Sequence, residues 1–552
     1  MTNPSPQNSW DHHRPSPNLW NYIAILGLVG IGVFLLLALP NSAADRAVFV
    51  RTVMLGICAS LIAIPLGALI AWICSADGIV SRILLVASLA LLLVPMFIHV
   101  SGWDAAFGKL GWLTSTRGQV LVPLVSGWTA ASWIHGLAAA PQVAVILLIG
   151  LAMGDRSYEE QALLETSSTR VFWNITFPRI APLLILCIVW NIVFCAREIA
   201  VTDLYQIGTL AEQIYLGYSL GINSVGGNWS ADQLAQAGNI SSTLTVAIVT
   251  WLSAVSLFLF TKLTALEFYG DQIAPRRAAR CGWKRNLAGI LILIVLVGVP
   301  IGNVLIRASF FVVPIDGVPT QGYSINQIFN AITRSALDYK NEFAWSFLIA
   351  ICSATLILAS ATLIGFVARR SRLAQIVLAV ALAITCALPG PTIGTLIAGL
   401  FSNLENGTFI HWFYNYTITG PVLANFIFCW PLGTLIVWFV FRKVPEDSLD
   451  AANVDGAGWV TRLSRFGLTE NRRALIGCWF VTFALSFGEL SASQIVRPAG
   501  MDTVPRKMLG DLHAGVNEMT AGITIVTAFT VVVISLVGWY FIRLNHRSVG
   551  RK

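Results

Sequence analysis

The sequence predicts an all-α, polytopic membrane protein with about twelve transmembrane helices arranged as two parallel six-helix repeats. Asp, Glu, Lys and Arg make up only 11% of the 552 residues, whereas the apolar residues make up 56%. A soluble domain carries roughly 25% charged residues, so this chain has too few charges to keep its apolar surface in water. The composition excludes a soluble multidomain enzyme and indicates that the protein lies in a lipid bilayer.

The predicted spans are stretches free of acidic and basic residues that reach, or nearly reach, the roughly 20 residues a helix needs to cross a bilayer. They are approximately 15–44, 52–76, 83–103, 118–154, 180–196, 233–261, 287–306, 343–368, 373–404, 406–441, 474–488 and 519–542. The first could pass for a secretory signal, but about 21 apolar residues are long enough for a retained helix. Helix-breaking residues within the spans can mark bends; they include Pro65, Pro95, Pro141, Pro389, Gly390 and Pro391.

The basic residues set the orientation. If the N-terminus is cytoplasmic and each stretch crosses once, most of the 35 Lys and Arg fall on cytoplasmic segments, as the positive-inside rule expects. We therefore expect a multi-pass protein of the inner (plasma) membrane with both termini in the cytoplasm. A basic cluster between Lys262 and Arg285 lies in the middle of the chain, where a linker between two halves would lie. The sequence has no basic stretch interleaved with aromatic residues, so we expect no nucleic-acid partner.

The two halves of the chain also repeat. Matching residues lie at a nearly constant separation: Ile57-Cys58 with Ile351-Cys352, Pro95 with Pro389, Ser157 with Ser448, and Glu198 with Glu489. An even number of spans per half makes both copies face the same way, as in transporters with parallel repeats. The expected division is a cytoplasmic tail (1–18), a first half (19–262), a basic linker (263–286), a second half (287–542) and a cytoplasmic tail (543–552).

A short polar segment precedes the fifth span of each half, at Ser157–Glu165 and at Pro445–Gly458. Each begins with acidic residues that suit a helix N-terminus, and each is predicted to form an amphipathic helix on the cytoplasmic face. Such a helix is suited to dock a soluble partner, whereas the alternative is an ordinary interfacial loop. In the second segment Leu449, Ala452 and Val454 are expected to enter the partner's groove, and Gly456 to supply the turn.

The second segment resembles the Glu-Ala-Ala loop of binding-protein-dependent ABC importer permeases, in the form Asp450-Ala451-Ala452 followed by Gly456. The first segment looks like a degenerate copy, with acidic residues where Ala and Gly are usual. The resemblance implies that both loops couple the membrane protein to an ATPase subunit. The residues it assigns to coupling are Glu159, Glu160, Glu165, Pro178, Asp450, Ala451, Ala452 and Gly456.

This resemblance covers nearly the whole chain, because fused two-half permeases include the iron(III) importers. The segment Phe487–Ser493 and the residues up to Gly515 look like the external loop of iron(III) permeases, and thiamine and aminophosphonate permeases look similar there. The resemblance implies import of ferric iron, with thiamine, an aminophosphonate or a polyamine as alternative cargoes. The partners it implies are an ABC ATPase, as two copies or two domains at the cytoplasmic face, and an extracytoplasmic solute-binding protein.

Two acids are candidates for the transport pathway. Glu198 and Glu489 occupy equivalent positions just past the two shortest spans, where an acid is costly unless it faces water, a partner or the bundle interior. They would form a negative collar that favours a cation; the alternative is structural pairing, for example with Arg197 or Arg497. Asp203 and His513 are weaker candidates.

The chain itself shows no motif for covalent chemistry. A phosphate-binding loop would need G-x-x-x-x-G-K-[ST], and the nearest approach, Gly102 to Leu110, has the wrong spacing and ends on Leu. We therefore expect a transport subunit that is not an enzyme, with no cofactor and no resident metal. The rival from another class is a secondary transporter driven by an ion gradient, which would not need the two cytoplasmic loops. A membrane-embedded enzyme would need polar clusters that the sequence does not offer.

Overall fold

The computed structural model describes residues 43–115, 123–152, 157–220, 282–315, 318–402 and 408–549. These residues are almost entirely helical. By length and apolar composition, six of their helices can cross a membrane, or eight if each of two bent helix pairs counts as one span. The protein is therefore membrane-embedded and predominantly α-helical, as the composition predicts.

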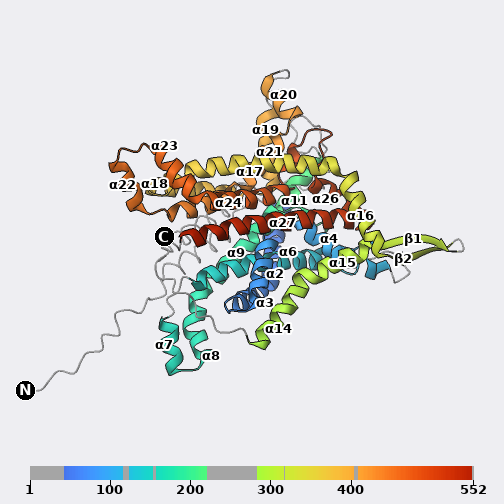
Figure 1. Cartoon of the computed structure of the whole chain (residues 1–552). Helices are drawn as coiled ribbons and strands as arrows, with labels where there is room; N and C mark the ends of the chain where they lie inside the picture. Colours follow the sequence, from blue (N-terminus) through green and yellow to red (C-terminus); the bar gives the residue numbers. More distant parts are fainter. Residues whose placement is uncertain are drawn as a thin grey trace, which may run out of the picture.

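The elements fall into an N-terminal part (residues 43–220) and a C-terminal part (residues 282–549) on either side of residues 221–281 (Figure 1). The N-terminal part contains α2 (Ala43–Cys74), α3 (Ile79–Leu91), α4 (Met96–Phe107), α5 (Trp112–Ser115), α6 (Gly127–Ala152), α7 (Ser157–Glu165), α8 (Ser168–Val171), the π-helix η2 (Phe172–Thr176), α9 (Phe177–Arg197), α10 (Ala200–Leu204) and α11 (Leu210–Ser219). The C-terminal part begins with α14 (Trp283–Leu293), the π-helix η3 (Ile294–Gly298), α15 (Val299–Ala308), β1 (Phe310–Ile315), β2 (Val318–Tyr323) and α16 (Ile325–Asp338). It continues with α17 (Lys340–Ala368), α18 (Arg372–Ala387), α19 (Gly390–Ser402), α20 (Phe409–Tyr416), α21 (Thr419–Arg442), α22 (Glu446–Val454), α23 (Trp459–Arg462), the π-helix η4 (Leu463–Thr469), α24 (Glu470–Phe487), α25 (Ser493–Val496), α26 (Val504–Ala514) and α27 (Glu518–Val549).

Six of the twelve predicted spans, 52–76, 118–154, 287–306, 343–368, 406–441 and 519–542, overlap the six helices that can cross a membrane. The predicted span 233–261, and all but the end of 15–44, lie outside the described residues. The predicted spans 180–196 and 474–488 match α9 and α24, which are 21 and 18 residues long and are not among the six helices that meet the spanning criteria.

Two predicted spans are not straight crossings. The stretch 83–103 is the pair α3–α4, bent by 108°, and 373–404 is the pair α18–α19, bent by 101°. Prolines account for the positions of the breaks: Pro95 directly precedes α4, and Leu388, which precedes Pro389, has the extended backbone that a residue before proline adopts. Pro65 and Pro141, by contrast, lie inside the continuous helices α2 and α6.

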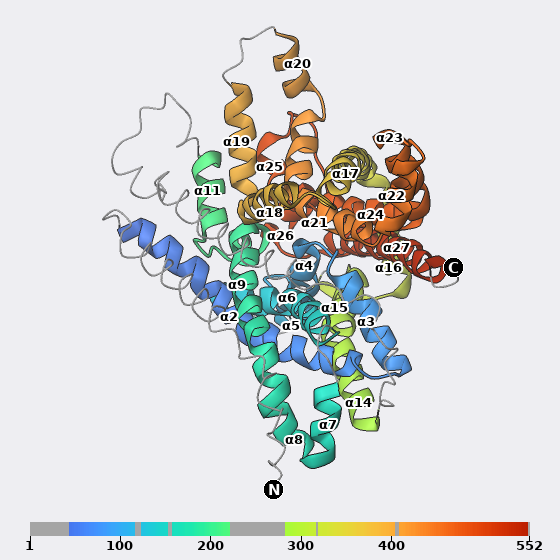
Figure 2. The same ribbon diagram turned by 90° about the vertical axis from the view of Figure 1, so that its left-hand side faces the viewer.

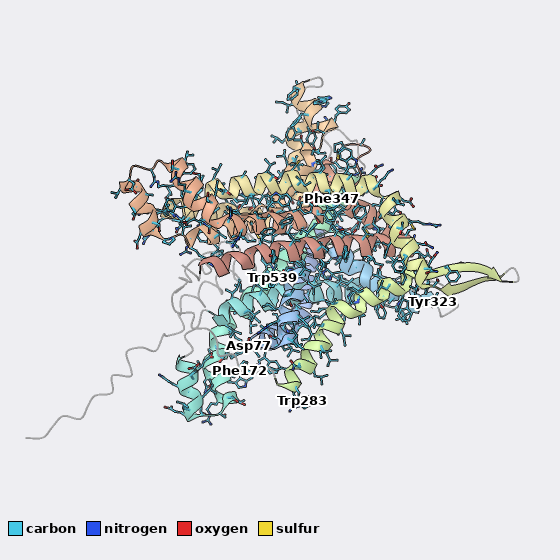
Figure 3. The ribbon with its side chains drawn as sticks, viewed as in Figure 1. Asp77, Phe172, Trp283, Tyr323, Phe347 and Trp539 are labelled. Atoms are coloured by element: carbon cyan, nitrogen blue, oxygen red, sulfur yellow. The ribbon has the colours of Figure 1, made fainter. Side chains whose placement is uncertain are left out.

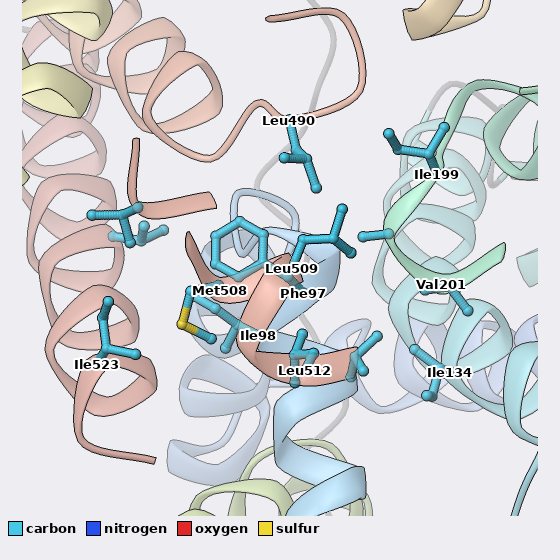
Figure 4. Packing of buried hydrophobic residues seen from close by; sticks show 14 of the residues in the cluster. Phe97, Ile98, Ile134, Ile199, Val201, Leu490, Met508, Leu509, Leu512 and Ile523 are labelled. Carbon is cyan, nitrogen blue, oxygen red and sulfur yellow. The ribbon is translucent and has the colours of Figure 1, made fainter. Parts of the chain in front are cut away.

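The two parts share one hydrophobic core. Its largest cluster of buried side chains combines residues of α4, α6 and α10 with residues of α26, α27 and the segment after α24. In Figure 4, Phe97 of α4 lies beside Leu509 of α26 and below Leu490. Elsewhere the helices expose large apolar side chains, such as Leu61 and Phe529, that lipid would cover. Core packing therefore joins the parts at their centre.

The surface helices define two sides of the molecule. The pairs α7–α8 and α22–α23 and the end of α27 lie on the left in Figure 1, and Figure 2 views the protein from that side. The hairpin β1–β2, which we did not predict, projects from the opposite side. In Figure 3, Phe172 lies next to α7–α8, whereas Tyr323 marks the hairpin side.

Candidate functional site

A cavity of about 190 Å³ lies where the two parts of the chain meet. Its walls come from the α3–α4 break, α6 and the end of α9 in the N-terminal part. They also come from α21, the end of α24 and the segment after α24 in the C-terminal part. Glu198 and Glu489, the two predicted pathway residues, both line it, and so does Arg197. The structure thus brings together two acids that are far apart in the sequence.

Both glutamates are buried and hold the backbone of the short helix that follows them. Glu198 accepts hydrogen bonds from the backbone N–H groups of Ala200 and Val201, at the start of α10. Glu489 accepts them from Ala492, at 2.6 Å, and Ser493, at 3.0 Å, at the start of α25. A carboxylate suits this place because the first N–H groups of a helix have no partner within it.

The positions of the arginines show whether the glutamates form the structural ion pairs that the sequence leaves open as an alternative. The alternative that Glu489 pairs with Arg497 is wrong, because Arg497 Nη1 instead lies 3.0 Å from Asp502 Oδ1, its neighbour in the same loop. Glu198 has a second neighbour, since its Oε2 lies 3.6 Å from Nε2 of the fully buried His135. Each glutamate therefore has a structural role as a helix cap in addition to its place in the cavity wall.

Arg197 joins the two parts at this cavity. Its Nη2 donates to the backbone oxygen of Phe428 at 3.2 Å, and its guanidinium lies 4.2 Å from the centre of the Phe428 ring. Its Nη1 lies 3.7 Å from Sγ of Cys386. Arg197 is the last residue of α9, whereas Phe428 is in α21 and Cys386 in α18. The sequence suggests Arg197 only as a partner for an acid. In the structure its guanidinium also connects the two parts of the chain.

The backbones also approach closely here. A Cβ atom added to Gly488 would lie 2.9 Å from Cβ of Pro95 and closer still to its Cγ. Gly488 follows α24 and Pro95 is at the α3–α4 break, so this contact crosses between the parts and forms part of the cavity wall. Only a residue without a side chain fits this position.

Asp203 and His513 form a further contact between the parts. Asp203 Oδ2 in α10 lies 3.5 Å from His513 Nε2 in α26. Burial raises the pKa of the Asp203 carboxyl, and His513 partly opposes that shift. The structure brings these two weaker pathway candidates together, although neither lines the cavity that contains Glu198 and Glu489.

We expect Glu489→Gln to lower the free energy of unfolding by about 1–3 kcal/mol, because glutamine has one acceptor oxygen for two backbone N–H groups. The exposed Glu470, in the first turn of α24, is the matched control, and Glu470→Gln should change stability by no more than about 0.5 kcal/mol. Thermal unfolding of the detergent-solubilised protein, followed by circular dichroism, measures both. Equal melting temperatures for the two variants would refute the capping role.

The first predicted coupling segment forms an exposed helix. Glu160 and Glu165 of α7 are exposed, and Leu164 is 89% exposed. The α7 helix packs on α8, and Thr176 Oγ1 of η2 donates to Oε1 of Glu159 at 3.0 Å. Pro178 is exposed near the start of α9. The first segment therefore presents acids and one almost fully accessible leucine on its surface.

The second segment is built differently. Gly456 has φ +78°, so it supplies the predicted turn after α22, and Asp450 pairs with Arg370 at 2.8 Å on the surface. The expectation that Leu449 and Ala452 enter a partner's groove is wrong, because both are buried against their own chain. Leu449 belongs to a cluster with residues of α17, α21 and α24. Only Val454 of the three, at 87% exposed, is open to a partner, while Ala451 is exposed beside it.

Each surface segment leads along the chain, through one turn and then an unbroken run of helix, to one cavity glutamate. The chain runs from α7 through α8, η2 and α9 to Glu198, and from α22 through α23, η4 and α24 to Glu489. In both places a π-helical turn lies at the same point, between the surface helix and the helix that enters the protein. Such turns are rare and frequently mark functional sites. We did not predict them, because no simple sequence signal specifies a π-helix.

Among the described residues, no group of three or more His, Cys, Asp or Glu side chains could hold a metal ion. The fold and the site together define a class, that of helical membrane-embedded proteins with a mainly apolar cavity between two parts of the chain that contains two acidic side chains. No family model matches this chain, and no curated protein is significantly similar to it.

Proposed function

We propose that this protein is the channel-forming permease subunit of an ATP-driven importer of the ABC class, and that its chain is a fused pair of six-helix repeats. The observation that carries the proposal is the pair of matching chain paths, each of which runs from a surface helix through a turn and a π-helical segment to a cavity glutamate. A partner that moves α7 and α22 acts through α9 and α24 on Glu198 and Glu489. The coupling residues follow from the resemblance described above, and the repeat follows from the nearly constant separation of matching residues in the two halves.

The two paths favour two-fold repetition because they match in several independent features. Each begins after a long apolar helix, passes through a π-helical turn and ends at a glutamate that caps a short helix. Each part also carries one helix pair bent by more than 100° at a proline. Alternate access then requires the two parts to move against each other around the shared cavity.

The charges of the cavity support a cation as cargo. Two carboxylates and one guanidinium line it, so ionised side chains leave a net negative charge there. Ferric iron is the first cargo we propose, and it crosses without a permanent site. Thiamine, an aminophosphonate or a polyamine is the alternative. A separate ATPase at the α7 and α22 side and a solute-binding protein on the hairpin side complete the proposed complex.

The coupling surfaces can be tested with charged substitutions at their exposed apolar residues. We expect Leu164→Asp and Val454→Asp each to weaken ATPase binding, and the double variant to abolish binding and ATP-dependent uptake, since a charge in an apolar docking contact is left unpaired. Ile325→Asp is the matched control. Ile325 is 72% exposed but begins α16, beside the hairpin on the far side.

The measurement is co-purification of the wild-type chain and its variants with the ATPase subunit of the same organism, followed by uptake into proteoliposomes. Uptake of radiolabelled ferric iron, thiamine, an aminophosphonate and a polyamine identifies the cargo. A well-folded wild-type chain that binds no ATPase overturns the proposal. If uptake proceeds in the absence of ATP and a protonophore abolishes it, the protein is instead a secondary transporter.

A further inference from the structure

The helix α16 lies between two helices that can cross the membrane but is too short to cross it itself, with 14 residues. The first of the two, Trp283–Ala308, ends just before the hairpin β1–β2, and the second, Lys340–Ala368, begins two positions after the last residue of α16. Figure 1 shows α16 across the ends of α17 and α27, on the hairpin side of the protein. The helix therefore lies at the level where the chain leaves the bilayer.

One face of α16 packs on the start of α27. Ala331 and Ser335 are buried, and Ser335 Oγ donates a hydrogen bond of 3.1 Å to the backbone oxygen of Met519. A Cβ atom added to Gly522 would lie 2.5 Å from the backbone oxygen of Ala331, so the two helices are in close contact. Met519 and Gly522 belong to the first turns of a second helix that can cross the membrane, Glu518–Ile542. This contact fixes α16 at the level where α27 begins.

A second face of α16 is apolar and is left open by the chain. Ile325 is 72% exposed and Phe329 is 65% exposed, and Ile332 is half-buried beside them. These residues share one face of the helix because they are four and three positions apart. In water this face would keep two large apolar side chains hydrated, which is unfavourable.

The remaining face of α16 is polar. Asn326, Asn330 and Arg334 are exposed and lie four positions apart. With 3.6 residues per turn, the polar face lies opposite the packed face, and the apolar face adjoins the packed one. Since the packed face rests on the start of a membrane-crossing helix, the polar face points away from the bilayer and the apolar face borders on it. This arrangement is typical of a helix that lies in the membrane interface.

We propose that α16 is an interfacial helix whose apolar face, formed by Ile325, Phe329 and Ile332, is immersed in the phospholipid leaflet on the hairpin side. Phospholipid is favoured over a protein partner because α16 is joined directly to α17 and packed on α27, and Leu348 and Ile351 of α17 already expose apolar side chains to lipid. A helix held in this way fixes the depth at which α17 and α27 enter the bilayer. Lipid contact at α16 does not depend on the proposed function, because α16 lies on the side of the protein opposite α7 and α22.

The test places the photoreactive amino acid p-benzoylphenylalanine at single positions of the full-length protein in phospholipid nanodiscs. After irradiation, intact-protein mass spectrometry measures the fraction of the protein that gains the mass of one phospholipid. Phe329 and Asn330 form the matched pair, because both are exposed and they lie on the apolar and the polar face. We expect the phospholipid adduct in a severalfold larger fraction at Phe329 than at Asn330. Leu348, exposed on α17, is the positive control for lipid contact.

Equal adduct fractions at Phe329 and Asn330 would overturn the proposal. Irradiation of the Phe329 variant in cell membranes gives a second test. Joining mainly to a second copy of the chain, or to a solute-binding protein, would show that protein covers this face and would also overturn it. If the Phe329 variant does not fold, the same comparison is made one turn earlier, between Ile325 on the apolar face and Asn326 on the polar face.

Discussion

Gly488→Ala is expected to destabilise the protein by about 3 kcal/mol or more, at the upper end of the cost of overpacking a core. The backbone of Gly488, with φ −95° and ψ 1°, is open to any residue, so the cost comes from contact alone. The added methyl group would overlap the ring of Pro95, which is rigid and cannot rotate away. To make room for the methyl group, the α3–α4 break would have to move away from the segment that follows α24.

A double-mutant cycle makes this prediction specific. Pro95→Ala removes the ring atom nearest to the added methyl group, so it should recover much of the stability that Gly488→Ala loses. Gly510→Ala is the control, because nothing lies within 4 Å of its added Cβ inside α26, and it should be neutral or stabilising by up to about 1 kcal/mol. Thermal unfolding in detergent gives the values. Additive losses in the double variant would contradict the contact.

Arg197→Met is expected to cost about 2–4 kcal/mol, the second large effect. It removes a charged hydrogen bond to the Phe428 backbone and a guanidinium held over the Phe428 ring, while the methionine fills much of the same volume. Arg197→Lys should recover only part of the loss, because an ammonium cannot keep the planar contact and the fork of donors together.

Arg285 provides the matched control for this effect. Its guanidinium also lies 4.2 Å from an aromatic ring centre, that of Trp72, but it is near the start of α14 and far from the central cavity. Arg285→Met should therefore cost no more than about 1 kcal/mol. Melting temperatures of the two variants, measured under one set of detergent conditions, provide the comparison. A loss at Arg285 equal to that at Arg197 would show that the interface contact adds nothing.

The sequence predicts those features of this protein that local chemistry decides. Apolar stretches identify the long helices, Pro95 and Pro389 mark the two bends, and Gly456 adopts the positive φ of its predicted turn. The matching separations in the sequence also predict that Glu198 and Glu489 are equivalent, and the structure brings both to one cavity.

Features that depend on tertiary contacts could not be predicted. Leu449 and Ala452 have the same amphipathic pattern whether they face a partner or their own chain, and the packing of α17, α21 and α24 decides it. Arg497 lies near both Glu489 and Asp502 in sequence, and the loop conformation selects Asp502. A cavity of about 330 Å³ that Trp103, Trp133 and Tyr205 line combines residues of α4, α6 and the end of α10, whose proximity no sequence spacing reveals.

The unequal anchoring of the two surface helices has a mechanical consequence. Two side chains of α22 are buried in the protein and Asp450 pairs with Arg370, whereas α7 packs on α8, accepts one hydrogen bond from η2 at Glu159 and leaves both of its leucines at least half exposed. A force applied to α22 therefore moves the helices packed against it, whereas the same force applied to α7 first displaces α7 itself. A partner that pulled on both helices with equal force would therefore move the two sides of the cavity by different amounts, and the C-terminal side would respond first.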